Sequence, residues 1–126
     1  MSIEVQNVSK SYGAQKALDQ ISFSVKKGEI VGFLGPNGAG KSTLMKILTT
    51  FIAADEGTAS VNGNDVTENP KLVQQSVGYL PEHNPLYLDL YVREYLAFNA
   101  DVYKIAKTRI EEVIELTGLT SESHKK

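Results

Sequence analysis

Nine consecutive residues have the types and the spacing of a phosphate-binding loop. They fit G-x-x-x-x-G-K-[ST], with a lysine at position 41 and a serine at position 42. Glycines let backbone N–H groups approach an anion closely, and the positive end of a following helix also faces it. In this pattern Lys41 reaches the β- and γ-phosphates, and the Ser42 hydroxyl faces Mg²⁺. The sequence therefore predicts that nucleotide phosphate is bound by Gly35, Pro36, Asn37, Gly38, Ala39, Gly40, Lys41, Ser42 and Thr43.

The segments on either side of the loop predict the strand and the helix that this motif requires. Residues 29–34 form an almost unbroken apolar run, typical of a parallel strand buried on both faces. After the loop, apolar residues recur at the spacing of one helix face, at Leu44, Ile47, Leu48 and Phe51. The alternative, a glycine-rich turn with a chance lysine, does not explain this strand–loop–helix order.

Composition indicates one soluble domain. The chain has 126 residues, of which 41% are hydrophobic and 22% charged, with a net charge of −2 and no cysteine. That charge argues against a nucleic-acid-binding surface. No apolar run approaches the ~18 residues needed to span a bilayer, and no signal-peptide pattern opens the chain. We therefore expect a cytoplasmic protein without a nucleic-acid partner.

Periodicity elsewhere predicts an antiparallel β layer and several short elements. Two strands with one buried face each are expected, one ending near Tyr12 and one around residues 21–25. Further elements are a strand at 58–61 before a tight turn at Asn62-Gly63, a helix at 71–75 after Asn69-Pro70, and a strand at 76–80.

From about Tyr91 the apolar spacing becomes helical. One stripe comprises Val92, Tyr95, Leu96, Val102 and Tyr103, and a second comprises Ala106, Ile110, Val113, Ile114 and Thr117. Gly118 is expected to cap the second helix. Its solvated side is predicted at Lys104, Lys107, Arg109, Glu111, Glu112 and Glu115. We place a boundary near residue 86, between an α/β core at 1–85 and a helical part at 86–126.

Several residues together resemble the ATP-binding subunit of ABC transporters. The loop reads G-P-N-G-A-G-K-S-T, and Ser11-Tyr12-Gly13 looks like the family's aromatic loop. Residues 77–82 are similar to its segment around the γ-phosphate-sensing loop, in the Y-L-P-E form of bacterial ABC-2 type and gliding-motility ATPases. The resemblance runs from residue 2 to about residue 117. It implies an α/β phosphate-loop NTPase core, here its N-terminal part, with an antiparallel β layer and the start of a helical subdomain.

The resemblance implies roles for further residues. Tyr12 would stack on adenine, since an aromatic face contacts a purine well; the alternative is a tyrosine that only ends a strand. Ala17 would line the same pocket. Thr43 would bond the α-phosphate, and the backbone of residues 38–41 would hold the β-phosphate.

Glu82 stands where the family usually has a glutamine that helps to hold Mg²⁺ and the attacking water. A carboxylate oxygen also serves a hard cation, but it adds negative charge and only accepts hydrogen bonds. We expect Ser42 and Glu82 to contact Mg²⁺ when nucleotide is bound; the alternative for Glu82 is a solvated loop carboxylate. His83 is expected to be a bystander, because one lone histidine makes no metal site.

The family's later motifs do not occur in this sequence: the serine-glycine-glycine signature, the acidic strand end, the adjoining glutamate base and the switch histidine. We interpret the chain as the N-terminal half of an ATPase domain, with no complete catalytic set, that binds ATP and Mg²⁺ without efficient hydrolysis. The open edge of the strand at 30–34 predicts self-association.

For the parent protein, the resemblance implies an ATPase that drives transport across a membrane. Its partners would be a transmembrane permease and a second ATPase subunit, and it would lie at the inner face of the cell membrane. Alternatives are a soluble ABC-type ATPase acting on ribosomes or DNA, and a nucleotide-binding module without catalysis. A small GTPase is disfavoured because no N-K-x-D motif occurs, and a nucleotide kinase because Arg93 and Arg109 are the only arginines.

Overall fold

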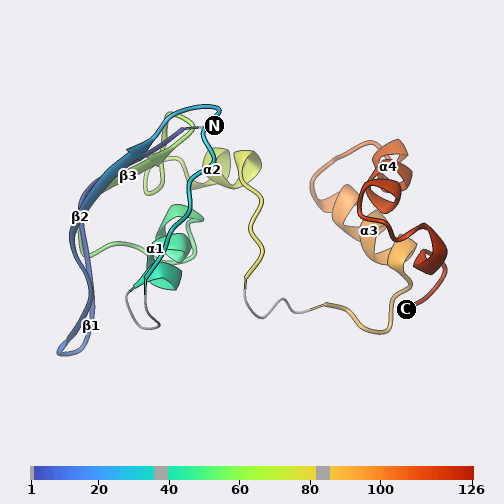
Figure 1. Cartoon of the computed structure of the whole chain (residues 1–126), viewed down its shortest axis with the longest axis horizontal. Coiled ribbons are helices and arrows are strands. Elements are labelled where there is room, and N and C mark those ends of the chain that lie inside the picture. Colours follow the sequence, from blue (N-terminus) through green and yellow to red (C-terminus); the bar gives the residue numbers. More distant parts are fainter. Residues whose placement is uncertain (1, 36–39, 82–85) are drawn as a thin grey trace. The chain divides into compact units, whose positions relative to one another are not determined.

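The computed structural model describes residues 2–35, 40–81 and 86–126 (Figure 1). The chain divides into two compact units, Met1–Tyr79 and Leu80–Lys126, which are described separately below. Among the helices of the described residues, none has the length and apolar character needed to cross a membrane.

The first unit is built on an antiparallel sheet with the strand order β2-β1-β3-β4. β1 (Ile3–Tyr12) and β2 (Gln15–Val25) form a long hairpin, in which Tyr12 lies opposite Gln15. β3 (Glu56–Val61) pairs with the other side of β1, and β4 (Asn64–Asp65) completes the sheet. The predicted antiparallel layer is thus confirmed.

Two local signals in this unit are confirmed. The turn from β3 to β4 is made by Asn62 and Gly63, which both have positive φ angles, of 53° and 79°. This is the backbone that Asn-Gly favours in a two-residue hairpin turn. α2 (Pro70–Ser76) begins after Asn69 with proline in its first turn, as expected.

The core of the first unit lies between the sheet and α1 (Lys41–Leu48), which covers one sheet face (Figure 1). The helix buries Leu44, Ile47 and Leu48, the first three members of the predicted stripe. They belong to one apolar cluster with residues from three strands and α2, namely Val5, Val8, Leu18, Ala59, Val61 and Val73.

Phe51, the fourth member of the predicted stripe, is not in this core. The helix ends at Leu48, and Thr50 adopts a left-handed φ of 71°. The chain therefore leaves the helix before Phe51, whose side chain is exposed. The centroids of the Phe51 and Tyr79 rings are 5.8 Å apart.

The prediction of a buried parallel strand at residues 29–34 is wrong. In the structure these residues are irregular, and Ile30 and Leu34 are almost fully exposed. A parallel strand obtains its backbone hydrogen bonds from neighbouring strands, and none of the described strands pairs with this segment. The strand expected at 76–80 is not formed either: Val77 is extended, with φ −120° and ψ 136°, but also has no strand partner within the described sheet.

This exposed apolar segment should make the chain self-associate. An unpaired, extended apolar run is a template for pairing with another copy. We expect the mass measured by light scattering to rise with concentration, and the double variant Ile30→Lys/Leu34→Lys to reduce that rise. The control Leu116→Lys, at an exposed helical position, should leave it unchanged. A parent chain that stays monomeric at every concentration would refute this prediction.

The second unit contains α3 (Val92–Val102), α4 (Thr108–Leu116) and a short 3-10 helix, η1 (Thr120–Glu122). At the start of α3, the Glu94 carboxylate accepts a hydrogen bond from the Tyr91 N–H at 3.1 Å. After α4, Gly118 has a φ of 73° and the Leu119 N–H donates to the Ile114 carbonyl at 2.9 Å, so the predicted glycine cap is confirmed.

The predicted faces of these two helices are confirmed in part. Ile114 is buried, but Ala106, Thr117, Val102 and Tyr103 are exposed. The charged side of α4 is solvated as expected, and Arg109 pairs there with Glu112. Arg93 of α3 also pairs with Glu111.

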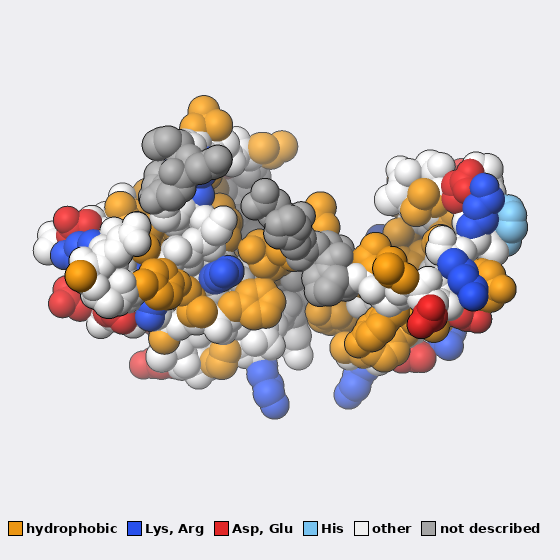
Figure 2. All heavy atoms as spheres, turned by 90° about the horizontal axis from the view of Figure 1, so that it is seen from below, with side chains coloured by type: hydrophobic (Ala, Val, Ile, Leu, Met, Phe, Trp, Pro, Cys, Tyr) orange, Lys and Arg blue, Asp and Glu red, His pale blue; other side chains and the backbone are white. Residues whose placement is uncertain are grey.

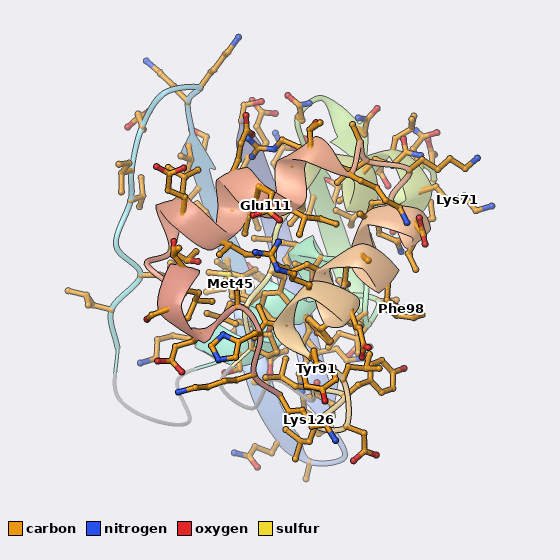
Figure 3. The ribbon with its side chains drawn as sticks, turned by 90° about the vertical axis from the view of Figure 1, so that its right-hand side faces the viewer. Met45, Lys71, Tyr91, Phe98, Glu111 and Lys126 are labelled. Carbon is orange, nitrogen blue, oxygen red and sulfur yellow. The ribbon has the colours of Figure 1, made fainter. Side chains whose placement is uncertain are left out.

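The chain's last residues fold back on the start of α3. The Val92 N–H donates to the Lys125 carbonyl at 2.9 Å. Figure 3 shows Tyr91 and Lys126 close together, with the Lys126 Nζ 5.5 Å from the centroid of the Tyr91 ring. The Lys125 carbonyl thus supplies an acceptor for one of the N–H groups in the first turn of the helix that have no partner within it.

Candidate functional site

The described parts of the phosphate loop are its two ends. Gly35 is exposed at one end, and Gly40 stands directly before α1 at the other, with φ 91° and ψ 5°. Between them, Pro36, Asn37, Gly38 and Ala39 lie outside the described residues, so their roles stay predictions. Glu82 and His83 also lie outside the described residues.

Lys41 links the two ends of the loop. Its Nζ donates a hydrogen bond to the Gly35 carbonyl, so the side chain runs back along the loop. The side chain is half-buried. This orientation places an ammonium group beside the segment that the motif assigns to phosphate.

The first turn of α1 carries N–H groups that have no acceptor within the helix itself. The first hydrogen bond of the helix is made by the Leu44 N–H to the Gly40 carbonyl at 2.9 Å. The N–H groups of Lys41, Ser42 and Thr43 precede it and have no acceptor within the helix. Together with the positive end of the helix, they form an environment that favours an anion.

β2 packs closely against the junction of loop and helix. A Cβ placed on Gly40 would lie 2.3 Å from the Ala17 carbonyl oxygen and 2.8 Å from Leu18 Cδ2. Ala17 and the phosphate loop, which are 23 residues apart along the chain (40 − 17), are therefore neighbours in space. This proximity supports the predicted contribution of Ala17 to the nucleotide pocket.

Replacing Gly40 with alanine should damage both stability and nucleotide binding. The variant has the strain of a positive φ and a clash with the backbone of β2, together worth roughly 2–5 kcal/mol of unfolding free energy. Gly63→Ala is the matched control, because Gly63 also has a positive φ but open space around it. Urea unfolding should show a clearly larger loss for Gly40→Ala. Equal losses in the two variants would show that the contact with Ala17 is unimportant.

Tyr12 lies at the last position of β1, and its side chain is 51% exposed. The Lys10 Nζ lies over the ring, 5.6 Å from its centroid. The ring thus has the accessibility that stacking on a base requires, although the contact with adenine remains a prediction.

Asp55 ties this strand end to the segment that follows α1. One carboxylate oxygen accepts from the Ser11 N–H at 2.8 Å, and the other pairs with the Lys10 Nζ at 3.3 Å. The Asp55 N–H donates to the Ser9 carbonyl at 2.9 Å. Sequence reasoning did not single out Asp55, because its partners lie 44 and 45 residues away and leave no local pattern.

The charge of Asp55 is stabilised by these partners. The Ser11 N–H, and after it the Lys10 ammonium, hold the pKa of the Asp55 carboxyl below its usual value. The pKa of Asp55 is lower in the folded chain than in the unfolded chain. The carboxylate therefore stabilises the fold at pH values above the pKa that Asp55 has in the unfolded chain. That contribution is lost as the pH falls through the folded-state pKa.

Ser42 is the described residue that the phosphate-loop motif assigns to magnesium. Within residues 2–35, 40–81 and 86–126 there is no group of three or more His, Cys, Asp or Glu side chains that could hold a metal ion. Ser42 lies in the first turn of α1 and is exposed. Its hydroxyl is a hard oxygen ligand of the kind Mg²⁺ takes alongside phosphate oxygens and water.

Known proteins share both the sequence and the fold. A family model described as ABC transporter matches residues 18–126. The chain is 37% identical over 128 residues to the linearmycin resistance ATP-binding protein LnrL of Bacillus subtilis (strain 168), covering 98% of this chain and 41% of that protein. It is also 37% identical over 124 residues to the bacitracin transport ATP-binding protein BcrA of Bacillus licheniformis, covering 98% and 40%.

A solved structure of the ATP-binding subunit of an ABC transporter superposes with a TM-score of 0.86 at 29% identity, covering 99% of this chain and 54% of that one. The chain thus spans about two fifths of the length of the two curated relatives. The resemblance seen in the phosphate loop and in residues 77–82 is confirmed across nearly the whole chain. The chain belongs to the ABC transporter ATP-binding family, and its fold is the N-terminal part of that family's α/β phosphate-loop core.

Proposed function

We propose that this chain holds MgATP and forms part of an ATPase that couples ATP binding and hydrolysis to transport across a membrane. The observation that carries the proposal is the site at the start of α1. There the Lys41 ammonium turns back onto the Gly35 carbonyl, and the first helical turn carries N–H groups that have no acceptor within the helix. A polyphosphate is the ligand that uses all of these donors at once.

In this proposal each part of the site has one task. Lys41 neutralises the β- and γ-phosphates, Thr43 bonds the α-phosphate, and the Ser42 hydroxyl is a magnesium ligand. Tyr12 and Ala17 take the base side of the nucleotide. The loop residues 36–39 complete the phosphate cradle, and Glu82 contacts Mg²⁺ or its water. Bound Mg²⁺ supplies positive charge that offsets the charge of the triphosphate.

We propose a permease and a second ATPase subunit as partners of the protein that contains this chain. LnrL and BcrA are named for linearmycin resistance and bacitracin transport. A subunit of this kind would work at the cytoplasmic face of the membrane, bound there through the permease.

An apolar surface on the second unit supports a protein partner. It consists of Leu86, Tyr87, Leu88, Tyr91 and Phe98, all of which are exposed. Tyr87 and Phe98 meet edge to face, with their ring centroids 5.6 Å apart. Figure 2 shows hydrophobic side chains gathered on the visible face of this unit. Contiguous exposed apolar side chains are typical of interaction sites, and we assign this surface to the permease contact.

The proposal is tested by measuring binding and turnover on the same sample. We expect MgATP to bind the chain in calorimetry, whereas phosphate release stays at the background rate. The family's signature, glutamate base and switch histidine do not occur in these 126 residues, and phosphoryl transfer depends on such positioning and charge stabilisation. A folded chain that binds no MgATP would contradict the first part, and rapid phosphate release would contradict the second.

A further inference from the structure

Three side chains meet at the end of β1, where the proposed adenine contact lies. Lys10 and Tyr12 are two residues apart on one strand and therefore share a face. The Lys10 Nζ lies over the Tyr12 ring at 5.6 Å from its centroid. The same Nζ is 3.3 Å from an Asp55 oxygen. One ammonium thus contacts both the aromatic ring and the carboxylate.

Asp55 stands where the strand beside β1 ends. The pairing of β1 with β3 reaches only to Ser9 opposite Glu56. Beyond that pair, the Ser11 N–H donates to the Asp55 carboxylate at 2.8 Å. The Asp55 side chain therefore provides β1 with one more hydrogen-bond acceptor past the end of its pairing with β3. This bond fixes the backbone at Ser11, directly before Tyr12.

We propose that Lys10 and Asp55 are positioning residues for Tyr12, and that they leave one defined face of its ring for a purine. The Lys10 ammonium lies over one face of the ring and excludes a base from it. Asp55 holds both the ammonium and the Ser11 N–H, so it fixes the position of the ammonium relative to the backbone beside Tyr12. This inference rests on the proposed function, in which Tyr12 stacks on the base of the nucleotide.

The environment of the pair suits a positioning role better than a stabilising one. The side chains of Lys10 and Asp55 are 19% and 48% exposed. Ion pairs that are partly in water contribute little to stability, whereas a cation over an aromatic face is attracted to it and orients it. The Ser11 N–H, and after it the Lys10 ammonium, hold the pKa of the Asp55 carboxyl below its usual value, which agrees with the contacts of this carboxylate.

The test compares two ligands, of which one has a nucleoside attached to its phosphates and the other has phosphates alone. The probes are MgATP and magnesium tripolyphosphate, which has phosphates but no purine. Lys10→Met removes the cation, and Asp55→Asn keeps an oxygen for the Ser11 N–H but removes the charge. We expect each variant to bind MgATP about 3- to 10-fold more weakly, and tripolyphosphate with unchanged affinity. Lys10→Arg should restore MgATP binding, because it restores the cation.

Lys16→Met is the matched control. Lys16 is a lysine on the neighbouring strand β2 that pairs with Asp19 at 3.1 Å, three residues away, so its removal should leave both affinities unchanged. If MgATP binding is unaffected by Lys10→Met and Asp55→Asn, the inference is overturned while the proposed function stands. An equal loss for both ligands also overturns it, because the pair then acts on the phosphate loop or on folding. If the parent binds neither ligand, the proposed function itself fails.

Discussion

Replacing Lys41 with alanine is expected to weaken MgATP binding by about 30- to 1,000-fold, or roughly 2–4 kcal/mol. The Lys41 side chain runs back to the Gly35 carbonyl, at the other described end of the loop. Without it, the β- and γ-phosphates lose the one side-chain cation of the loop, and only Mg²⁺ and backbone dipoles remain to offset their charge. The loss should appear in calorimetry as a weaker dissociation constant with unchanged stoichiometry.

Lys46→Ala is the control for this experiment. Lys46 is on the same helix, five residues further on, and its side chain is exposed. The variant changes the net charge as Lys41→Ala does, but outside the loop. Its MgATP affinity should match that of the parent within about twofold, because the exposed Lys46 ammonium lies outside the loop and salt weakens its interaction with the phosphates. Equal losses in both variants would mean that net charge, and not the loop lysine, governs binding.

Replacing Leu44 with alanine should remove roughly 3–5 kcal/mol of the unfolding free energy of the first unit. The Leu44 side chain is fully buried where α1 meets the sheet. Its truncation leaves a cavity in addition to the lost burial. Since small domains are stable by only roughly 5–15 kcal/mol, the midpoint of urea unfolding should fall steeply.

Leu72→Ala is the control that shows whether the loss of stability comes from burial of the leucine or from the change of residue type alone. Leu72 belongs to α2 of the same unit, but its side chain is 49% exposed. Its truncation should cost less than about 1 kcal/mol. Similar losses for the two leucines would contradict the assignment of the core to the face of α1 that contains Leu44.

Sequence reasoning succeeded where the determining pattern is local. The Asn62-Gly63 turn, the proline in the first turn of α2 and the Gly118 cap depend on neighbouring residues alone, and the structure confirms them. The strict alternation at Ile21, Phe23 and Val25 likewise predicted a strand with one buried face.

Sequence reasoning failed where the structure depends on residues far apart. The apolar run at 29–34 shows that this segment suits a buried strand, but hydrogen bonding in a sheet also needs a neighbouring strand, and none of the described strands adjoins it. The end of α1 before Phe51 follows from the backbone of Thr50, which the helical spacing does not reveal. The contacts of Asp55 with β1 arise only when the sheet forms.

The central claim is that N–H groups at the start of α1 hold the phosphates of a nucleotide. The most direct test is to titrate MgATP into the ¹⁵N-labelled chain and follow its backbone amide resonances. We predict that the largest shifts occur at Gly40, Lys41, Ser42 and Thr43, whereas the amides of α4 stay in place. Shifts confined to the second unit, or the absence of any shift at saturating MgATP, would contradict the account.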